Sequence, residues 1–126
     1  MNLRTPLSRV KGLGPAREGA SHWWNQRLTA IALVPLTLWF SFSVALLAVA
    51  DHATISAWIA SPVSIVLMIL MIIVGFYHGY LGLQVVIEDY VANEQLRFAL
   101  MIVVALLAVL FTAFGVVSVL KIAFGA

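Results

Sequence analysis

Three long apolar runs constrain this chain more than any other feature. They cover residues 28–50, about 63–87 and 98–120, and each holds at least 20 residues. About 20 residues at a rise of 1.5 Å cross a hydrocarbon core of roughly 30 Å. Backbone N–H and C=O groups that face lipid must be satisfied within their own segment, so such runs form helices. The predicted fold is therefore an all-α membrane protein with three transmembrane helices.

The composition supports this fold class. The chain has 126 residues, of which 63% are hydrophobic and 10% charged, with a mean hydropathy of +1.09. A soluble domain carries about 25% charged residues, so there is too little polar surface here to coat a globule in water. The absence of cysteine excludes disulfides, thiol nucleophiles and self-ligated iron–sulfur clusters. We expect one membrane domain over residues 1–126, with residues 1–27 as a basic cytoplasmic arm.

The charges around the helices predict the orientation. Five basic residues precede the first helix, against Glu18 alone: Arg4, Arg9, Lys11, Arg17 and Arg27. Lys and Arg in short flanking segments favour the inner side of the membrane, which places the N-terminus inside and the C-terminus outside. The segments "DHATISAWIASPVS" and "EDYVANEQLR" read as short connections of helix hairpins, with Ser61–Pro62 starting the second helix.

His78 stands alone in the second apolar run. At 100° per residue it shares a helix face with Gly75, Gly82 and Asp89. Ionisable groups deep in a bilayer are rare, and an imidazole there serves as a haem-iron ligand, an interhelical hydrogen-bond partner or a proton relay. The spacing alone does not choose among these roles. Because three helices enclose little interior, we expect the polar groups to face another subunit.

Asp89 and Tyr90 mark the inner end of the second helix. Asp89 follows His78 by 11 residues, or roughly 16 Å along a helix axis. A phenolic O–H beside a carboxylate at the membrane boundary suits hydrogen bonding to a quinone carbonyl. Tyrosines also populate membrane interfaces as simple anchors. A quinone site and an interfacial anchor are both consistent with this pair.

Two motifs carry a resemblance to a known family. "HGYLGLQVVIEDYV" matches a His-x-x-x-Gly…Asp-Tyr-Val pattern, and "SHWWNQRLTAIAL" matches an Arg-x-Thr-Ala-Ile start of a first helix. In this order, across three helices, they resemble the hydrophobic membrane-anchor subunits of succinate dehydrogenase (complex II), in the form seen in alphaproteobacteria.

The resemblance implies roles for four residues. His78 matches the axial ligand of a b-type haem that is shared with a larger anchor subunit, and Arg27 matches an arginine near the haem propionates. Tyr90 matches the tyrosine that hydrogen-bonds the ubiquinone carbonyl, and Asp89 supports that site or a proton path to it. His22 and Trp23 lie shortly before Arg27 in the chain. The spacing from these two residues to Arg27 is one residue shorter than in some relatives.

The resemblance also implies a function within a larger assembly. The expected partners are a larger cytochrome b-type anchor subunit, an iron–sulfur subunit, a flavoprotein subunit and the lipid bilayer of the bacterial inner membrane, with no nucleic acid. Alone, the chain is expected to catalyse nothing. Within the complex it is expected to help bind haem b and to form part of the ubiquinone-reduction site that passes electrons from succinate to the quinone pool. The alternatives are the anchor of a fumarate reductase or other haem-b quinone oxidoreductase, a small proton-coupled transporter and a purely structural assembly subunit.

Overall fold

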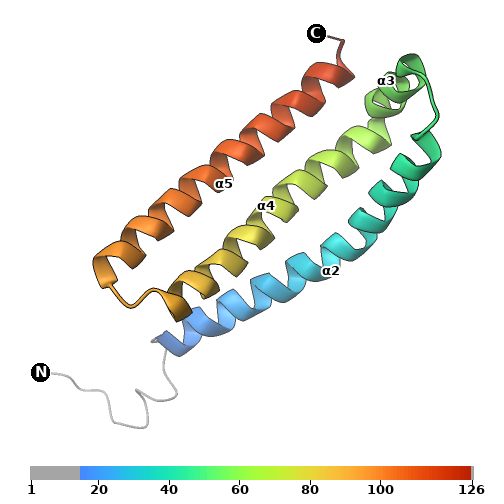
Figure 1. Ribbon diagram of the computed structural model, residues 1–126. Helices are drawn as coiled ribbons and strands as arrows, with labels where there is room; N and C mark the ends of the chain where they lie inside the picture. Colours follow the sequence, from blue (N-terminus) through green and yellow to red (C-terminus); the bar gives the residue numbers. More distant parts are fainter. Residues whose placement is uncertain (1–14, 126) are drawn as a thin grey trace, which may run out of the picture.

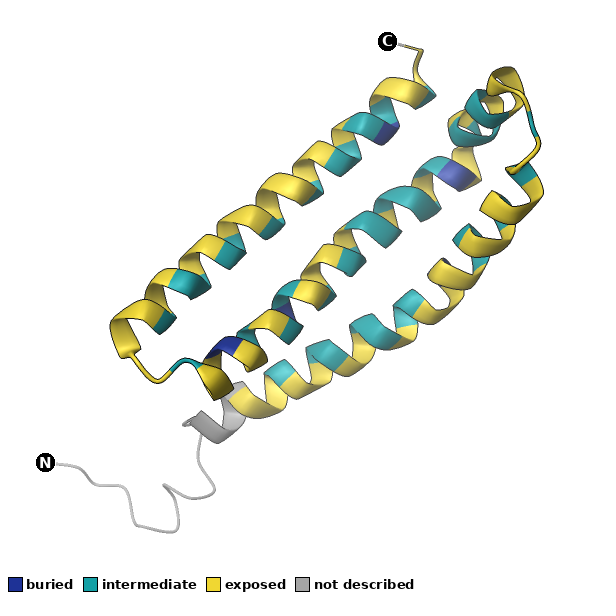
Figure 2. Cartoon of the chain, in the orientation of Figure 1, coloured by how far each residue is buried: buried dark blue, intermediate teal, exposed yellow. Residues whose placement is uncertain are grey.

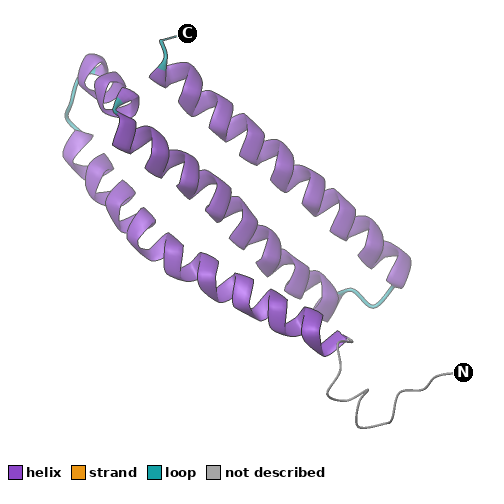
Figure 3. Cartoon of the chain, turned by 180° about the vertical axis from the view of Figure 1, so that it is seen from behind, coloured by secondary structure: helices purple, strands orange, loops and turns teal. Residues whose placement is uncertain are grey.

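The computed structural model describes residues 15–125 and is helical nearly throughout. Four helices follow in order: α2 (Pro15–Leu47), α3 (His52–Ala60), α4 (Pro62–Tyr90) and α5 (Glu94–Ala123) (Figure 1). Short loops join them, and the described residues contain no strand (Figure 3). Helices α2, α4 and α5 are each long and apolar enough to cross a membrane. The predicted all-α fold with three membrane-spanning helices is confirmed.

The helices extend beyond the predicted runs at every end but one, since α2 ends at Leu47, before the predicted end at residue 50. Helix α2 begins at Pro15, so residues 15–27, which were assigned to the arm, are helical, whereas Arg4, Arg9 and Lys11 lie outside the described residues. Hydropathy detects only the part of a helix that lipid covers, and polar residues continue the same helix beyond it. Helices α4 and α5 extend past their predicted ends for the same reason.

Side-chain caps explain where the later helices begin. The Ser61 hydroxyl accepts the N–H of Ser64 at 3.3 Å, and Pro62 occupies the first turn of α4, as expected for a helix start. Asn93 caps α5 in the same way. Asp51 caps the short helix α3, which the sequence reading had treated as plain connection.

Helix α4 lies between α2 and α5 (Figure 1). The start of α2 and the turn between α4 and α5 lie at one end of the molecule, whereas α3 and the C-terminus lie at the other. At this second end α3 contacts α4 and α5, and the rings of Trp39 and Trp58 stack with their centroids 5.5 Å apart. Asp89 and Tyr90, at the end of α4, therefore lie at the same end of the structure as the start of α2.

Little of the chain is buried (Figure 2). Among the described residues, the buried side chains are those of Leu36, Ser64, Leu81, Ile87 and Val119. Large apolar side chains cover the outside, as expected for surfaces that face lipid tails or other subunits. In the described residues, some polar side chains of the apolar helices lie between two helices, as Thr29 and His78 do, and others lie on the outside, as Thr37 does.

Candidate functional site

One face of α4 packs against α2, and it is the face that carries His78. A Cβ atom added at Gly75 would lie 4.0 Å from Leu33, and one added at Gly82 would lie 3.8 Å from the Gln26 amide nitrogen. Both distances are ordinary van der Waals contacts, so α2 and α4 lie against each other on either side of His78. The helix that packs against this face of α4 is therefore α2 of the same chain.

His78 forms a hydrogen bond across this α2–α4 interface. Its Nδ1 lies 2.8 Å from the Thr29 hydroxyl oxygen. The same hydroxyl donates to the backbone carbonyl of Asn25 at 2.7 Å, with the carbonyl of Gln26 at 3.0 Å. His78 is half-buried, and the bond engages Nδ1, so Nε2 is the ring nitrogen left for a further partner. Of the three roles that the sequence left open, an interhelical hydrogen bond is present.

Further polar side chains extend the α2–α4 interface toward the start of α2. The Asn25 side-chain amide donates to the Tyr77 hydroxyl at 3.2 Å. His22 Nε2 and Gln26 Oε1 are buried and have no hydrogen-bond partner among the described residues. His22 and Gln26 are spaced four residues apart and Thr29 follows three residues later, so they lie on one face of α2. The interface is thus polar over two turns of α2.

Asp89 and Tyr90 lie at the end of α4, and both are exposed. Tyr90 is 84% exposed, so its hydroxyl is free to meet a molecule outside this chain. The turn that follows is held by Arg97, whose Nε donates to the Val91 carbonyl at 3.1 Å and whose second guanidinium nitrogen donates to the Ala92 carbonyl at 3.5 Å. Arg97 thereby fixes the backbone directly after Tyr90.

Arg27 is not part of the contact around His78. Its guanidinium carbon lies 5.4 Å from the centre of the Trp23 ring, a cation–π contact along α2. At 100° per residue, Arg27 points about 160° away from Thr29 around the helix. The structure therefore brings His78 and Thr29 together, places Asp89 and Tyr90 at the helix end, and presents Arg27 on another face.

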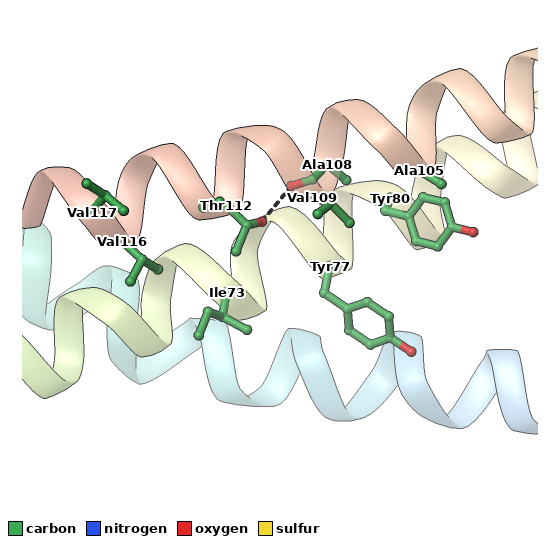
Figure 4. A pocket seen from close by; sticks show the side chains of 10 residues that line it. Ile73, Tyr77, Tyr80, Ala105, Ala108, Val109, Thr112, Val116 and Val117 are labelled. Carbon is green, nitrogen blue, oxygen red and sulfur yellow. Dashed lines mark hydrogen bonds between the residues drawn. The ribbon is translucent and has the colours of Figure 1, made fainter.

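A groove of about 680 Å³ runs between α4 and α5 (Figure 4). Ile73, Tyr77 and Tyr80 line it from α4, facing small and branched side chains of α5 such as Ala105. The Thr112 hydroxyl lies in this wall but donates to the carbonyl of Ala108 at 2.6 Å. The Tyr80 hydroxyl accepts the Gln84 side-chain amide at 2.9 Å. With these polar groups already paired, the groove is mainly an apolar surface.

Sequence reasoning missed several residues of the site. Thr29, Asn25 and Gln26 were not singled out, although the spacing of His22, Gln26 and Thr29 on one helix face was a readable signal. Arg97 was counted only as a charge. The spacing within α2 shows which of its residues share a face, but not that this face meets His78.

Comparison with known proteins agrees with the fold and the motifs. The model of the family described as "Succinate dehydrogenase/Fumarate reductase transmembrane subunit" matches residues 1–116. A "Succinate dehydrogenase hydrophobic membrane anchor subunit" of Rickettsia bellii is 34% identical over 118 residues, covering 94% of each chain. The protein of the same description from Paracoccus denitrificans is 33% identical over 90 residues, covering 71% of this chain and 70% of its own.

A third relative is similar over most of its length. The "Succinate dehydrogenase membrane anchor subunit" of Reclinomonas americana is 32% identical over 97 residues, covering 74% of this chain and 80% of its own. The family model covers more than half of the chain, including the first two apolar runs and most of the third. This chain is a multi-pass membrane protein that belongs to the family of succinate dehydrogenase/fumarate reductase transmembrane subunits.

Proposed function

We propose that this chain is the membrane anchor of a succinate dehydrogenase, that His78 is one axial ligand of a b-type haem, and that Tyr90 and Asp89 form part of a ubiquinone-reduction site. The observation that carries the proposal is the position of His78 on the α2–α4 interface, with Nδ1 bonded to Thr29 and Nε2 left for a ligand. Membership of the transmembrane-subunit family supports the role of membrane anchor, and the relatives above are described as anchor subunits of succinate dehydrogenase.

The side chains fit one half of a haem site. A histidine that ligates iron through one nitrogen usually donates its other N–H to a hydrogen-bond acceptor, and the Thr29 hydroxyl is such a partner for Nδ1. Within the described residues no three His, Cys, Asp or Glu side chains gather as a site for a bare metal ion. A haem would need only one axial ligand from this chain, because its porphyrin already holds the iron. A second histidine comes from the larger anchor subunit in this proposal.

A bound haem b supplies a one-electron redox group near the middle of the membrane. This chain's own contribution is to hold the His78 ring between α2 and α4, through the hydrogen bond between Nδ1 and the Thr29 hydroxyl. Arg27 lies outside the α2–α4 interface, where its guanidinium would pair with a carboxylate of the haem or of a partner subunit.

Tyr90 and Asp89 suit the quinone end of the pathway. The exposed Tyr90 hydroxyl donates a hydrogen bond to a ubiquinone carbonyl, and the Asp89 carboxylate beside it serves the protons that quinone reduction takes up. In this proposal the start of α2 and the α4–α5 turn face the cytoplasm, in line with the basic arm. The iron–sulfur subunit docks there, and the flavoprotein subunit lies beyond it. The membrane is the bacterial inner membrane.

Fumarate reductase is the second candidate, because the family description names both enzymes. The two differ in the direction of electron flow, and the names of the relatives favour succinate oxidation. A proton-coupled transporter finds no support in the family match.

A visible spectrum of the complex that copurifies with the chain tests the haem. We expect a b-type signal in the reduced-minus-oxidised spectrum that is lost or altered in His78→Ala, because an axial imidazole is removed. His52→Ala is the matched control, since His52 is exposed at the opposite end of the molecule. A wild-type complex without haem, or an unchanged spectrum in His78→Ala, contradicts the ligand assignment.

Quinone reduction tests Tyr90 separately. Tyr90→Phe removes one hydrogen bond to the substrate and is expected to slow succinate:ubiquinone reduction about tenfold, with the haem spectrum intact. Tyr80→Phe, a change within the membrane span, is the control. Loss of the haem signal in Tyr90→Phe, or a normal rate, argues against this role.

A further inference from the structure

The Thr29 hydroxyl is shared between the α2 backbone and the His78 ring. It lies 2.7 Å from the Asn25 carbonyl, 3.0 Å from the Gln26 carbonyl and 2.8 Å from His78 Nδ1. A hydroxyl has one hydrogen to donate and two lone pairs that accept. Both carbonyls can only accept, so the hydroxyl hydrogen points toward the backbone. The interaction with His78 is then satisfied by a hydrogen on Nδ1.

This arrangement selects one tautomer of a neutral imidazole. With the hydrogen on Nδ1, Nε2 carries the free lone pair, which is the form that ligates a metal. The two hydrogen bonds run in series, from Nδ1–H to the hydroxyl and from the hydroxyl to a carbonyl. Bonds in series polarise one another, which raises the basicity of Nε2.

Resting on the proposed function, we infer that Thr29 is a positioning residue for the haem ligand: it holds the His78 ring in the Nδ1–H tautomer, fixes its orientation and strengthens Nε2 as a donor to iron. Valine has nearly the shape of threonine but no hydroxyl. At position 29 it leaves Nδ1–H without this acceptor, inside a membrane where water does not replace it.

The chain offers a matched control in the same helix. The Thr37 hydroxyl bonds back to the carbonyls of Leu33 and Val34 at 2.6 and 3.2 Å, much as Thr29 does, but Thr37 is exposed. Thr37→Val therefore removes an equivalent hydroxyl and its backbone bond without touching His78. Thr29→Ser keeps the hydroxyl and is the conservative variant.

The experiment measures haem affinity and midpoint potential in the purified complex, with nitrogen NMR of ¹⁵N-histidine in the reduced complex to read the protonated ring nitrogen. In Thr29→Val we expect haem affinity to fall about 10- to 100-fold, the usual effect of losing such a partner. The potential should rise, because a weaker Nε2 donor stabilises the oxidised iron less. Thr29→Ser should restore both, and Thr37→Val should match the wild type.

The outcomes separate this inference from the proposed function. Wild-type affinity and potential in Thr29→Val, an equal change in Thr37→Val, or an unprotonated Nδ1 in the wild type overturns the role of Thr29 alone. A wild-type complex that contains no haem overturns the proposed function, and the role of Thr29 with it.

Discussion

The α2–α4 and α4–α5 interfaces are held together by different means. Across α4–α5, Gly115 lies so close to Ile72 that an added Cβ would come within 3.0 Å, and the rings of Phe76 and Phe111 stack 6.0 Å apart. Across α2–α4, side chains hydrogen-bond, as His78 does with Thr29. Lipid tails are as apolar as the helices, so close packing and polar contacts are the two ways to hold membrane helices together.

The two interfaces therefore differ in what they contribute: α4–α5 holds helices together, and α2–α4 carries the polar groups. The α4–α5 interface fixes the helix pair through shape, and the polar groups near it are already paired. The α2–α4 interface accepts polar groups that a packed interface would exclude, including two buried atoms, on His22 and Gln26, that have no partner among residues 15–125. Buried polar groups without partners are destabilising, so they are expected where function requires them.

The largest expected effect comes from overfilling the α4–α5 interface. Gly115→Leu forces Ile72 aside and should destabilise the chain by about 1–3 kcal/mol, seen as a lower melting temperature of the full chain in detergent. Gly79→Leu is the control, because an added Cβ there meets nothing within 4 Å. Equal destabilisation by both variants would mean that the close approach at Gly115 is not what holds α4 to α5.

A smaller effect of opposite sign is expected in the α2–α4 interface. Gln26→Met keeps the length of the side chain and removes the buried Oε1 atom, which has no partner in the part of the chain that the structure describes. Relief of an unsatisfied buried acceptor should stabilise the full chain in detergent by about 1 kcal/mol. A marked loss of melting temperature instead would show that Gln26 has a partner that the α2–α4 interface depends on.

The smallest effect lies outside both interfaces, at the start of α3. The Thr54 side chain and backbone N–H, the latter 2.9 Å away, hydrogen-bond the Asp51 carboxylate and hold its pKa below the usual range. A lowered pKa means that the stabilisation is present above the pKa of the unfolded chain and is lost as the pH falls through the folded value. Asp51→Asn keeps the cap but should remove this acid-sensitive part.

Melting curves of the full chain in detergent at neutral and acid pH measure this change. Identical pH dependence in the wild type and Asp51→Asn would exclude a role for the Asp51 charge in capping α3. Because Asp51 is exposed and screened by solvent, the expected difference is small.

Part of the site was readable from the sequence. The face that carries Gly75, His78 and Gly82 follows from helical spacing, and the structure confirms that a helix packs against it. The expectation that His78 faces another subunit was incomplete, because its Nδ1 is bonded to Thr29 of the same chain. The roles proposed for Asp89, Tyr90 and Arg27 stay predictions.

By itself, the sequence determined the number of membrane-spanning helices and several of their ends. The number of helices follows from the length and hydropathy of the apolar runs, because lipid requires a backbone that satisfies its own hydrogen bonds. The start of α4 follows from Ser61 and Pro62, since a cap depends on residues only a few positions apart. The tertiary structure decided that Thr29 meets His78, 49 positions away. Such a pairing depends on the register and rotation of α2 against α4, which packing sets and local sequence does not encode.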